Sequence, residues 1–137
     1  MRILIVASYR SYRNSFAAFV TEQGDALAAL GHEVKYFAVH GSNKSAMAYL
    51  KHLPKLRKII KEFKPNVVHA HFGLSGLLAN LQRLCPVVTT YHGSDINERK
   101  LRQLSKICIS LSAWNIFVSE KTMRIVKAKN NCTLLPC

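Results

Sequence analysis

The sequence predicts an α/β fold built on one parallel, doubly wound sheet of the Rossmann-like type. Short runs of β-branched and apolar residues alternate with longer segments in which apolar residues recur every three or four positions. The first strand candidate, residues 3–7, is continuously apolar, which is typical of a strand covered on both faces. No internal repeat or low-complexity linker interrupts the alternation. Right-handed crossovers between successive strands then give one layered domain.

Length and composition predict a single globular domain over residues 1–137. A hydrophobic content of 49% excludes a disordered chain. The four cysteines form no C-x-x-C pair, and no leader peptide is expected because residues 1–2 run directly into the first strand. These features favour a reducing, cytoplasmic location. No apolar run is long enough to cross a bilayer, so any membrane association is expected to be peripheral.

The charge balance is strongly basic, with 20 Lys and Arg against 7 Asp and Glu, a formal net charge of +13. Either the surplus is a solvated basic face, or the protein has an anionic partner. That partner would be membrane lipid, a nucleotide or phosphate-bearing substrate, or nucleic acid. The sequence has no helix-turn-helix, zinc finger or RNA-binding aromatic motif. We therefore do not expect a nucleic-acid partner.

The first predicted strand leads through a polar loop, residues 8–15, into a helix that faces the sheet. Asn14 or Ser15 is suited to cap this helix. Gly31 marks its end. The side chains expected to face the sheet recur every three or four positions. They are Phe16, Phe19, Val20, Gln23, Leu27 and Leu30.

Two later helices are basic and amphipathic. The first begins at Pro54, and its apolar positions are Leu56, Ile59, Ile60 and Phe63. The second follows Asp95, and its predicted inward positions are Leu101, Leu104, Ile107, Cys108 and Leu111. Cations occupy most of the remaining positions of the first of these helices, which has Glu62 as its one acidic residue. Such a face either is solvated or rests on an anionic membrane surface.

The remaining pattern completes the alternation of strands and helices. A further helix is predicted over residues 74–81, and another begins at Ser119-Glu120. The other strands are predicted at residues 33–39, 67–71, 87–91, 114–118 and 132–135.

Reactive side chains cluster where three of these strands end. The carboxyl ends of parallel strands share one edge of the sheet, and ligands of open α/β sheets bind there. The loop at residues 8–15 reaches the same edge. The candidate binding residues are Arg10, Arg13, Asn14, Ser15, His71, Phe72, Gly73, Gly93, Ser94, Asp95, Ser119 and Glu120, with His92 as the candidate catalytic residue.

Several of these residues have a structural interpretation as well. Ser94 or Asp95 would either fix the tautomer of the His92 ring or cap the next helix. Ser119 and Glu120 suit the start of a helix in any case. His69 and His71 point to the same side of a strand, but no carboxylate or cysteine in matching register completes a metal site, so none is predicted.

Three common catalytic and nucleotide-binding motifs are missing from the sequence. Neither G-x-G-x-x-G nor G-x-x-x-x-G-K-[ST] occurs, which disfavours ordinary dinucleotide and P-loop sites. The G-x-S-x-G turn of a serine hydrolase does not occur either.

Four stretches resemble the amino-terminal domain of a family 4 glycosyltransferase of the GT-B architecture. They are residues 1–6 together with 27–34, residues 66–73 (NVVHAHFG), residues 87–95 (VVTTYHGSD) and residues 117–120. Residues 133–137 are similar to the segment that leads out of that domain. The usual glycine-rich first loop is replaced here by SYRSYRNS.

The resemblance implies retaining transfer of a sugar from a nucleotide-sugar donor, without a catalytic metal or other cofactor. His92 would lie near the transferred sugar, and residues 10–15 with His71 and Phe72 would help to form the acceptor side. Arg10 and Arg13 would meet a phosphate on either substrate. The acceptor would be a glycan or a lipid-linked molecule, as in cell-surface polysaccharide synthesis.

The family's donor-binding second domain, with its paired glutamates, has no counterpart in these residues. The resemblance therefore implies an amino-terminal half that is inactive alone. The alternative hypothesis is a flavodoxin-like module that binds a small anion without catalysis.

Overall fold

Six parallel strands form one sheet in the computed structural model, which describes residues 1–9, 15–40 and 45–136. Their order across the sheet is β2-β1-β3-β4-β5-β6, so the predicted α/β, Rossmann-like fold is confirmed. Successive neighbours are parallel throughout. The strands are β1 (Arg2–Ser8), β2 (Glu33–Val39), β3 (Val67–His71), β4 (Val87–Tyr91), β5 (Trp114–Phe117) and β6 (Cys132–Leu134).

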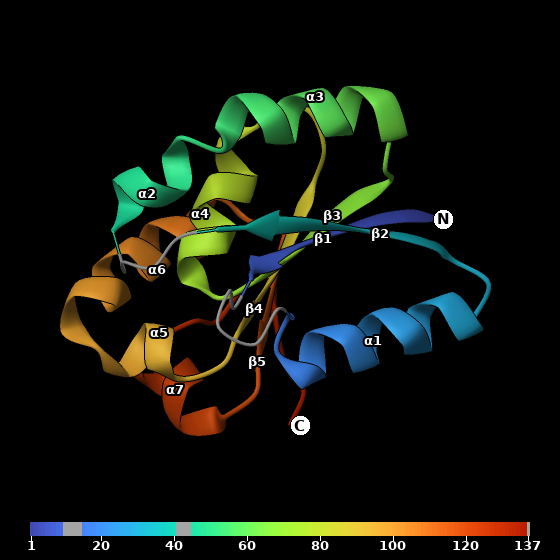
Figure 1. Ribbon diagram of the computed structural model, residues 1–137. Coiled ribbons are helices and arrows are strands. Elements are labelled where there is room, and N and C mark those ends of the chain that lie inside the picture. The colour runs from blue at the N-terminus through green and yellow to red at the C-terminus, as the bar shows by residue number, and fades with distance from the viewer. Residues whose placement is uncertain (10–14, 41–44, 137) are drawn as a thin grey trace.

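Helices connect these strands on both sides of the sheet. They are α1 (Ala18–Ala29), α2 (Ala46–Leu50), α3 (Leu53–Phe63), α4 (Gly73–Leu81), α5 (Ser94–Asn97), α6 (Arg99–Leu111) and α7 (Glu120–Ile125). Figure 1 shows α1 on one side of the sheet, with α2, α3, α4 and α6 on the other. The sequence pattern did not predict α2 and α5, because helices of five and four residues are too short to show a 3.6-residue period.

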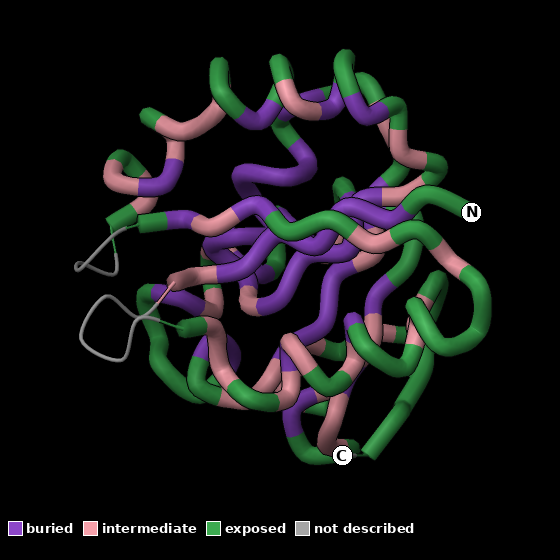
Figure 2. Tube along the Cα trace, turned by 45° about the vertical axis from the view of Figure 1, so that its right-hand side comes forward, coloured by how far each residue is buried: buried purple, intermediate pink, exposed green. Residues whose placement is uncertain are grey.

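Alternation along β1 divides the core into two layers. Ile3 and Ile5 pack with the α1 side, whereas Leu4 and Val6 belong to the larger cluster beneath α3 and α4. All four side chains are buried, as a central strand covered on both faces requires. Figure 2 shows this buried centre and the exposed outer turns of the helices. No helix in the described parts of the chain is long and apolar enough to cross a membrane.

Three helix residues that were predicted to face the core are exposed instead. Leu30 is 75% exposed because α1 ends at Ala29. Leu30 therefore lies beyond the last helical residue and no longer faces the sheet. Ile107 and Leu111 are also exposed. Helix α6 instead buries Leu101, Ser105 and Cys108, so its inward face is turned away from these two residues.

The predicted cap of α1 is wrong for Ser15. The helix begins at Ala18, the capping position is Ala17, and no side chain caps it. Asn14 lies outside the described residues. Pro54 does lie in the first turn of α3, as predicted.

Gly76 allows α4 to approach both the sheet and α6. A Cβ atom there would lie 2.6 Å from Thr89 Cγ2 and 2.5 Å from Cys108 Sγ, and both neighbours are buried. We expect Gly76→Ala to lower the free energy of unfolding by about 1–2 kcal/mol, since overpacking outweighs the gain in helix propensity. Urea denaturation measures the change.

The matched control combines Gly76→Ala with Cys108→Ala and Thr89→Ser, which remove the two crowding groups and keep the Thr89 hydroxyl. This background should reduce the cost of the added methyl group. An equal cost in both backgrounds would contradict the close approach.

Candidate functional site

The carboxyl ends of β3 and β4 bring His71 and His92 into direct contact. A hydrogen bond of 3.0 Å joins His71 Nδ1 to His92 Nε2, and the rings lie nearly parallel. Two residues earlier, His69 stacks on His71 and its Nε2 is hydrogen-bonded to Thr90 Oγ1 at 2.8 Å. Phe19 of α1 stacks on the outer side of His92, with ring centroids 4.2 Å apart. The result is a row of three imidazoles that ends at an aromatic ring.

All three imidazoles are held neutral at pH 7. Burial lowers the pKa of His71 to about 2, and its two histidine neighbours add to this effect. Burial likewise lowers the pKa of His69 and that of His92, each to about 4. A neutral imidazole can donate a hydrogen bond to a hydroxyl group from one nitrogen and accept one at the other. It does not supply the positive charge that would attract an anion.

The Asp95 carboxylate links the segments that follow β3 and β4 through hydrogen bonds. Its carboxylate accepts hydrogen bonds from the backbone N–H of Gly73 at 3.0 Å and of Gly93 at 3.1 Å. Burial raises the pKa of this carboxyl group to about 6, although the backbone N–H groups oppose the shift. Because Gly73 begins α4, Asp95 caps that helix across the β3–β4 edge rather than its own.

The backbone at this junction adopts unusual conformations. Phe72 has a φ of 71° and a ψ of 152°, a region that residues with a Cβ atom rarely occupy. Its N–H donates to Thr90 O, and the next N–H donates to Asp95. Gly93 has a φ of 109°, which favours glycine there. A strained residue, Phe72, and a turn that favours glycine, at Gly93, thus lie beside His92, and the Asp95 carboxylate binds the N–H groups of Gly73 and Gly93 there.

Five of the predicted residues line two hollows along this edge. The first, which we call the histidine hollow, has a volume of about 380 Å³ and is lined by Phe19, Glu22, Gln23, His71, Thr90, His92, Ile116, Val118 and Leu135. The second, the Ser94 hollow, has a volume of about 170 Å³ and is lined by Ser8, Tyr49, Phe72, Leu74, Ser94, Asp95 and Leu101. Ser8 and Tyr49 share a hydrogen bond between their hydroxyl groups.

Five of the predicted binding residues that the structure describes line neither hollow: Ser15, Gly73, Gly93, Ser119 and Glu120. Glu120 is exposed and forms an ion pair with Arg124 at 2.6 Å. Ser119 precedes α7 and accepts a hydrogen bond at its carbonyl from the Thr122 hydroxyl, but its side chain makes no capping bond. Ser15 is exposed. Arg10, Arg13 and Asn14 lie outside the described residues.

The structure adds residues that the sequence analysis did not place in the site. Phe19 and Gln23 belong to the α1 stripe that was assigned to packing alone, and Thr90 lies within a strand. A glutamine among apolar residues was the available signal, because a polar side chain on a buried stripe needs a partner. Nothing in the sequence pointed to Tyr49.

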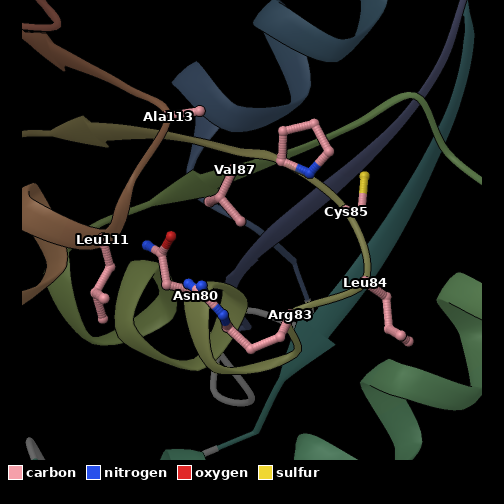
Figure 3. A pocket seen from close by; sticks show the side chains of 8 residues that line it. Asn80, Arg83, Leu84, Cys85, Val87, Leu111 and Ala113 are labelled. Carbon is pink, nitrogen blue, oxygen red and sulfur yellow. The ribbon is translucent and has the colours of Figure 1, made fainter.

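Another hollow lies at the opposite edge of the sheet and carries none of the predicted residues. Figure 3 shows its lining, which includes Asn80, Arg83, Leu84, Val87 and Leu111, and its volume is about 340 Å³. Asn80 is already satisfied by hydrogen bonds to Gly76 O and Ser112 Oγ. Within the described ranges, no group of three or more His, Cys, Asp or Glu side chains is arranged to hold a metal ion.

Solved structures share this arrangement of strands and helices. The apo form of the lipopolysaccharide outer core galactosyltransferase WaaB is 15% identical and covers 99% of this chain, with a TM-score of 0.72. Sucrose-phosphate synthase from Thermosynechococcus elongatus is 16% identical over 99% of the chain, with a TM-score of 0.75. UDP-GlcNAc 2-epimerase from Neisseria meningitidis, bound to UDP-GlcNAc, is 16% identical over 98%, with a TM-score of 0.63.

The chain spans 45%, 48% and 45% of these three proteins, respectively. At this level of identity the likeness shows the fold, which is that of one half of a GT-B enzyme. No curated protein sequence matched the chain. The family model described as Glycosyltransferase Family 4 matches residues 17–134. Since this match covers most of the 137 residues, the chain belongs to glycosyltransferase family 4.

Proposed function

We propose that this chain is the amino-terminal, acceptor-side half of a retaining glycosyltransferase. The enzyme transfers a sugar from a nucleotide-sugar donor to a glycan or lipid-linked acceptor, in cell-surface polysaccharide synthesis. The donor-binding half is contributed by a second α/β domain, so residues 1–137 alone do not catalyse transfer. Family membership supports the reaction type, and the match to 45% of the WaaB chain and 48% of one sucrose-phosphate synthase chain supports the division into two halves.

The observation that carries this proposal is the position of His92. Its ring lies at the carboxyl edge of the sheet, in contact with His71 and Phe19, and it lines the histidine hollow. The hydrogen bond to His71 Nδ1 occupies Nε2, and no described residue is hydrogen-bonded to Nδ1, which we assign to a ligand. In this role His92 hydrogen-bonds the transferred sugar and orients it for reaction.

The test is a transfer assay on the full-length gene product that contains this chain. We expect His92→Ala to reduce kcat/KM by about tenfold or more, which corresponds to the loss of roughly one strong hydrogen bond in the transition state. His32→Ala is the matched control, because His32 adjoins the amino end of β2 at the opposite edge of the sheet. Unchanged turnover in folded His92→Ala would remove His92 from the site.

We propose further that the protein associates peripherally with anionic membrane on the cytoplasmic side. Helix α3 carries exposed cations at Lys55, Arg57, Lys58 and Lys61. None of them forms an ion pair with another described residue. Arg99, Lys100 and Lys106 are exposed on α6, which covers the same side of the sheet. A surface with this charge attracts acidic lipid headgroups.

Cosedimentation with vesicles that contain phosphatidylserine tests this association. We expect the double substitution Lys58→Gln with Lys61→Gln to weaken binding by about 30-fold, at about 1 kcal/mol per lysine near an anionic surface. The control pair, Lys121→Gln with Lys129→Gln, gives the same net charge but alters α7 and the segment after it. Equal weakening by both pairs would indicate attraction by net charge alone.

A further inference from the structure

Strand β2 forms one border of the sheet and has a neighbouring strand on one side only. It is the outermost strand in the order β2-β1-β3-β4-β5-β6, and its seven residues pair with β1 in continuous register (Figure 1). In a parallel ladder, the backbone groups of alternate residues point towards the neighbouring strand, and those of the residues between them point away. Since Glu33 N–H donates to Met1 O, the odd-numbered residues of β2 are the ones that bond to β1.

The backbone groups of Val34, Tyr36 and Ala38 consequently point away from the sheet. None of these groups is hydrogen-bonded to another residue within the described ranges. The accessible part of the strand is its first half, because Phe37 and Val39 are buried. An unpaired strand edge of this kind is a template for a further strand.

The side chains along this edge are complementary to a second copy of themselves. Glu33 and Lys35 are exposed and lie on the same face of β2, because side chains alternate along a strand. In an antiparallel pair of β2 strands with its two-fold axis at Val34, Glu33 of each copy lies opposite Lys35 of the other. These positions form non-hydrogen-bonded pairs, in which side chains of the two strands come closest. Opposite charges at such positions stabilise strand pairing.

The same register also supplies partners for the outward backbone groups. The two Val34 residues exchange N–H···O bonds across the axis, and Tyr36 N–H of each copy reaches the His32 carbonyl of the other. That carbonyl is not hydrogen-bonded to another described residue, whereas the His32 N–H already donates to Leu27 O. The charge pairs and the backbone bonds therefore select the same axis.

The distribution of charge along the chain favours this edge for contact between two copies. With a formal net charge of +13, most faces of two copies repel each other. Residues 14–34, which include α1 and the start of β2, contain no Lys or Arg and have three acidic residues, Glu22, Asp25 and Glu33. Repulsion between copies is therefore weakest on the side where β2 is open.

We infer that two copies of this chain associate by antiparallel pairing of their β2 strands, centred on Val34. The two sheets then continue into each other across a two-fold axis. One short segment of each chain makes the contact, so the interface is small and a dissociation constant on the order of 10–100 µM is expected. The inference is independent of the proposed function, because β2 pairing involves neither His92 nor the histidine hollow.

Sedimentation equilibrium of the unmodified chain, at concentrations from about 1 to 500 µM, measures the association. We expect a monomer–dimer equilibrium, because a two-fold contact uses the same edge on both copies and closes at the dimer. A monomer at every concentration would overturn the inference. Steadily growing assemblies would overturn it as well, since they require two different surfaces on each copy.

Charge substitutions test the opposed pairs. Glu33→Lys places lysines opposite each other and should weaken dimerisation by about tenfold or more. The exchange of both charges, Glu33→Lys with Lys35→Glu, should restore it. Glu62→Lys is the matched control on the exposed face of α3, because it changes the net charge of the chain as Glu33→Lys does, and it should weaken dimerisation by less than about threefold. Equal weakening by Glu33→Lys and Glu62→Lys, or no restoration by the exchange, would overturn the charge pairing.

Amide hydrogen exchange identifies the register. The N–H groups of Val34 and Tyr36 should be protected at high protein concentration and exchange rapidly at low concentration. Lys35 N–H, which faces β1, should be protected at both concentrations, and Ala38 N–H, which lies outside the paired segment, at neither. Concentration-dependent protection of Ala38 as well would place the axis at Tyr36 and overturn the register.

Proline substitutions separate strand pairing from other contacts. Val34→Pro removes an outward N–H without removing a hydrogen bond to β1, as edge strands tolerate, and should weaken dimerisation by about tenfold or more. Ala38→Pro makes the same change outside the paired segment and should leave dimerisation unchanged. An unchanged dissociation constant for folded Val34→Pro would overturn the inference.

Discussion

Acidification from pH 7 to pH 5 is expected to lower the free energy of unfolding by about 4 kcal/mol. The cause is the row His69, His71 and His92, whose pKa values burial lowers to about 4, about 2 and about 4. In the unfolded chain all three rings take up a proton near pH 6.5, whereas in the folded protein they stay neutral down to those lower values. The unfolded state therefore binds more protons below about pH 6.5, and stability falls as the pH falls.

Asp95 acts in the opposite direction over part of this interval. Burial raises its pKa to about 6 from an ordinary value of 3.8, so the folded state binds more protons here between those values. Its contribution grows as the pH falls and offsets about 1 kcal/mol of the histidine effect by pH 5. His69 and His71 each contribute about 2 kcal/mol over the same interval, and the partly exposed His92 contributes about 1 kcal/mol, so the net change is a loss of stability.

Urea denaturation at pH 7, 6 and 5 measures this dependence. The double substitution His69→Gln with His71→Asn keeps a nitrogen at each hydrogen-bonding position towards Thr90 and His92 but cannot take up a proton. In this variant the effects of His92 and Asp95 remain and oppose each other, so stability should change by less than about 1 kcal/mol between pH 7 and pH 5. A parent protein that is equally stable at pH 7 and pH 5 would show that the histidine row is not buried as described.

Replacement of Asp95 by alanine is expected to cost about 3–4 kcal/mol of stability. The carboxylate is 3% exposed and satisfies the N–H groups of Gly73 and Gly93. Alanine would leave two buried donors without partners, at about 1–3 kcal/mol each. It would also release the strained turn at Phe72, so the contact between His71 and His92 should loosen.

Asp95→Asn is the informative companion variant, since its single carbonyl oxygen satisfies one of the two donors. We expect it to cost about half as much as Asp95→Ala in urea denaturation. Asp25→Ala, on the exposed face of α1, should change stability by less than about 0.5 kcal/mol. If Asp95→Ala cost as little stability as Asp25→Ala, the Asp95 carboxylate would not be what links the ends of β3 and β4.

The strands could be predicted closely from the sequence because their signals are local. Residues 33–39, 67–71 and 87–91 were predicted as strands and form β2, β3 and β4 with those bounds. Apolar runs between polar turns can be recognised as strands without knowledge of the partner strands. The helix positions Leu30, Ile107 and Leu111 were wrong because inward orientation depends on how a helix is rotated against its neighbours, which periodicity alone does not determine.

The candidate site was only partly predictable for a related reason. Strand ends carry His71 and His92 to one edge whatever the detailed packing, so this contact follows from a parallel sheet. Phe19 and Gln23 reach the same hollow from α1, which lies about 50 positions earlier in the chain than His71. No spacing rule relates residues so far apart.

The sequence by itself determined the fold class, the shared edge of His71 and His92, and the family whose motifs the chain carries. The tertiary structure alone decided that Asp95 caps α4, that Glu120 pairs with Arg124, and that Phe19 and Gln23 line one hollow with His71. The physical reason is that strand and helix periodicity is encoded by neighbours in the chain. Hydrogen-bond partnership and burial depend instead on which distant segments the packing brings together.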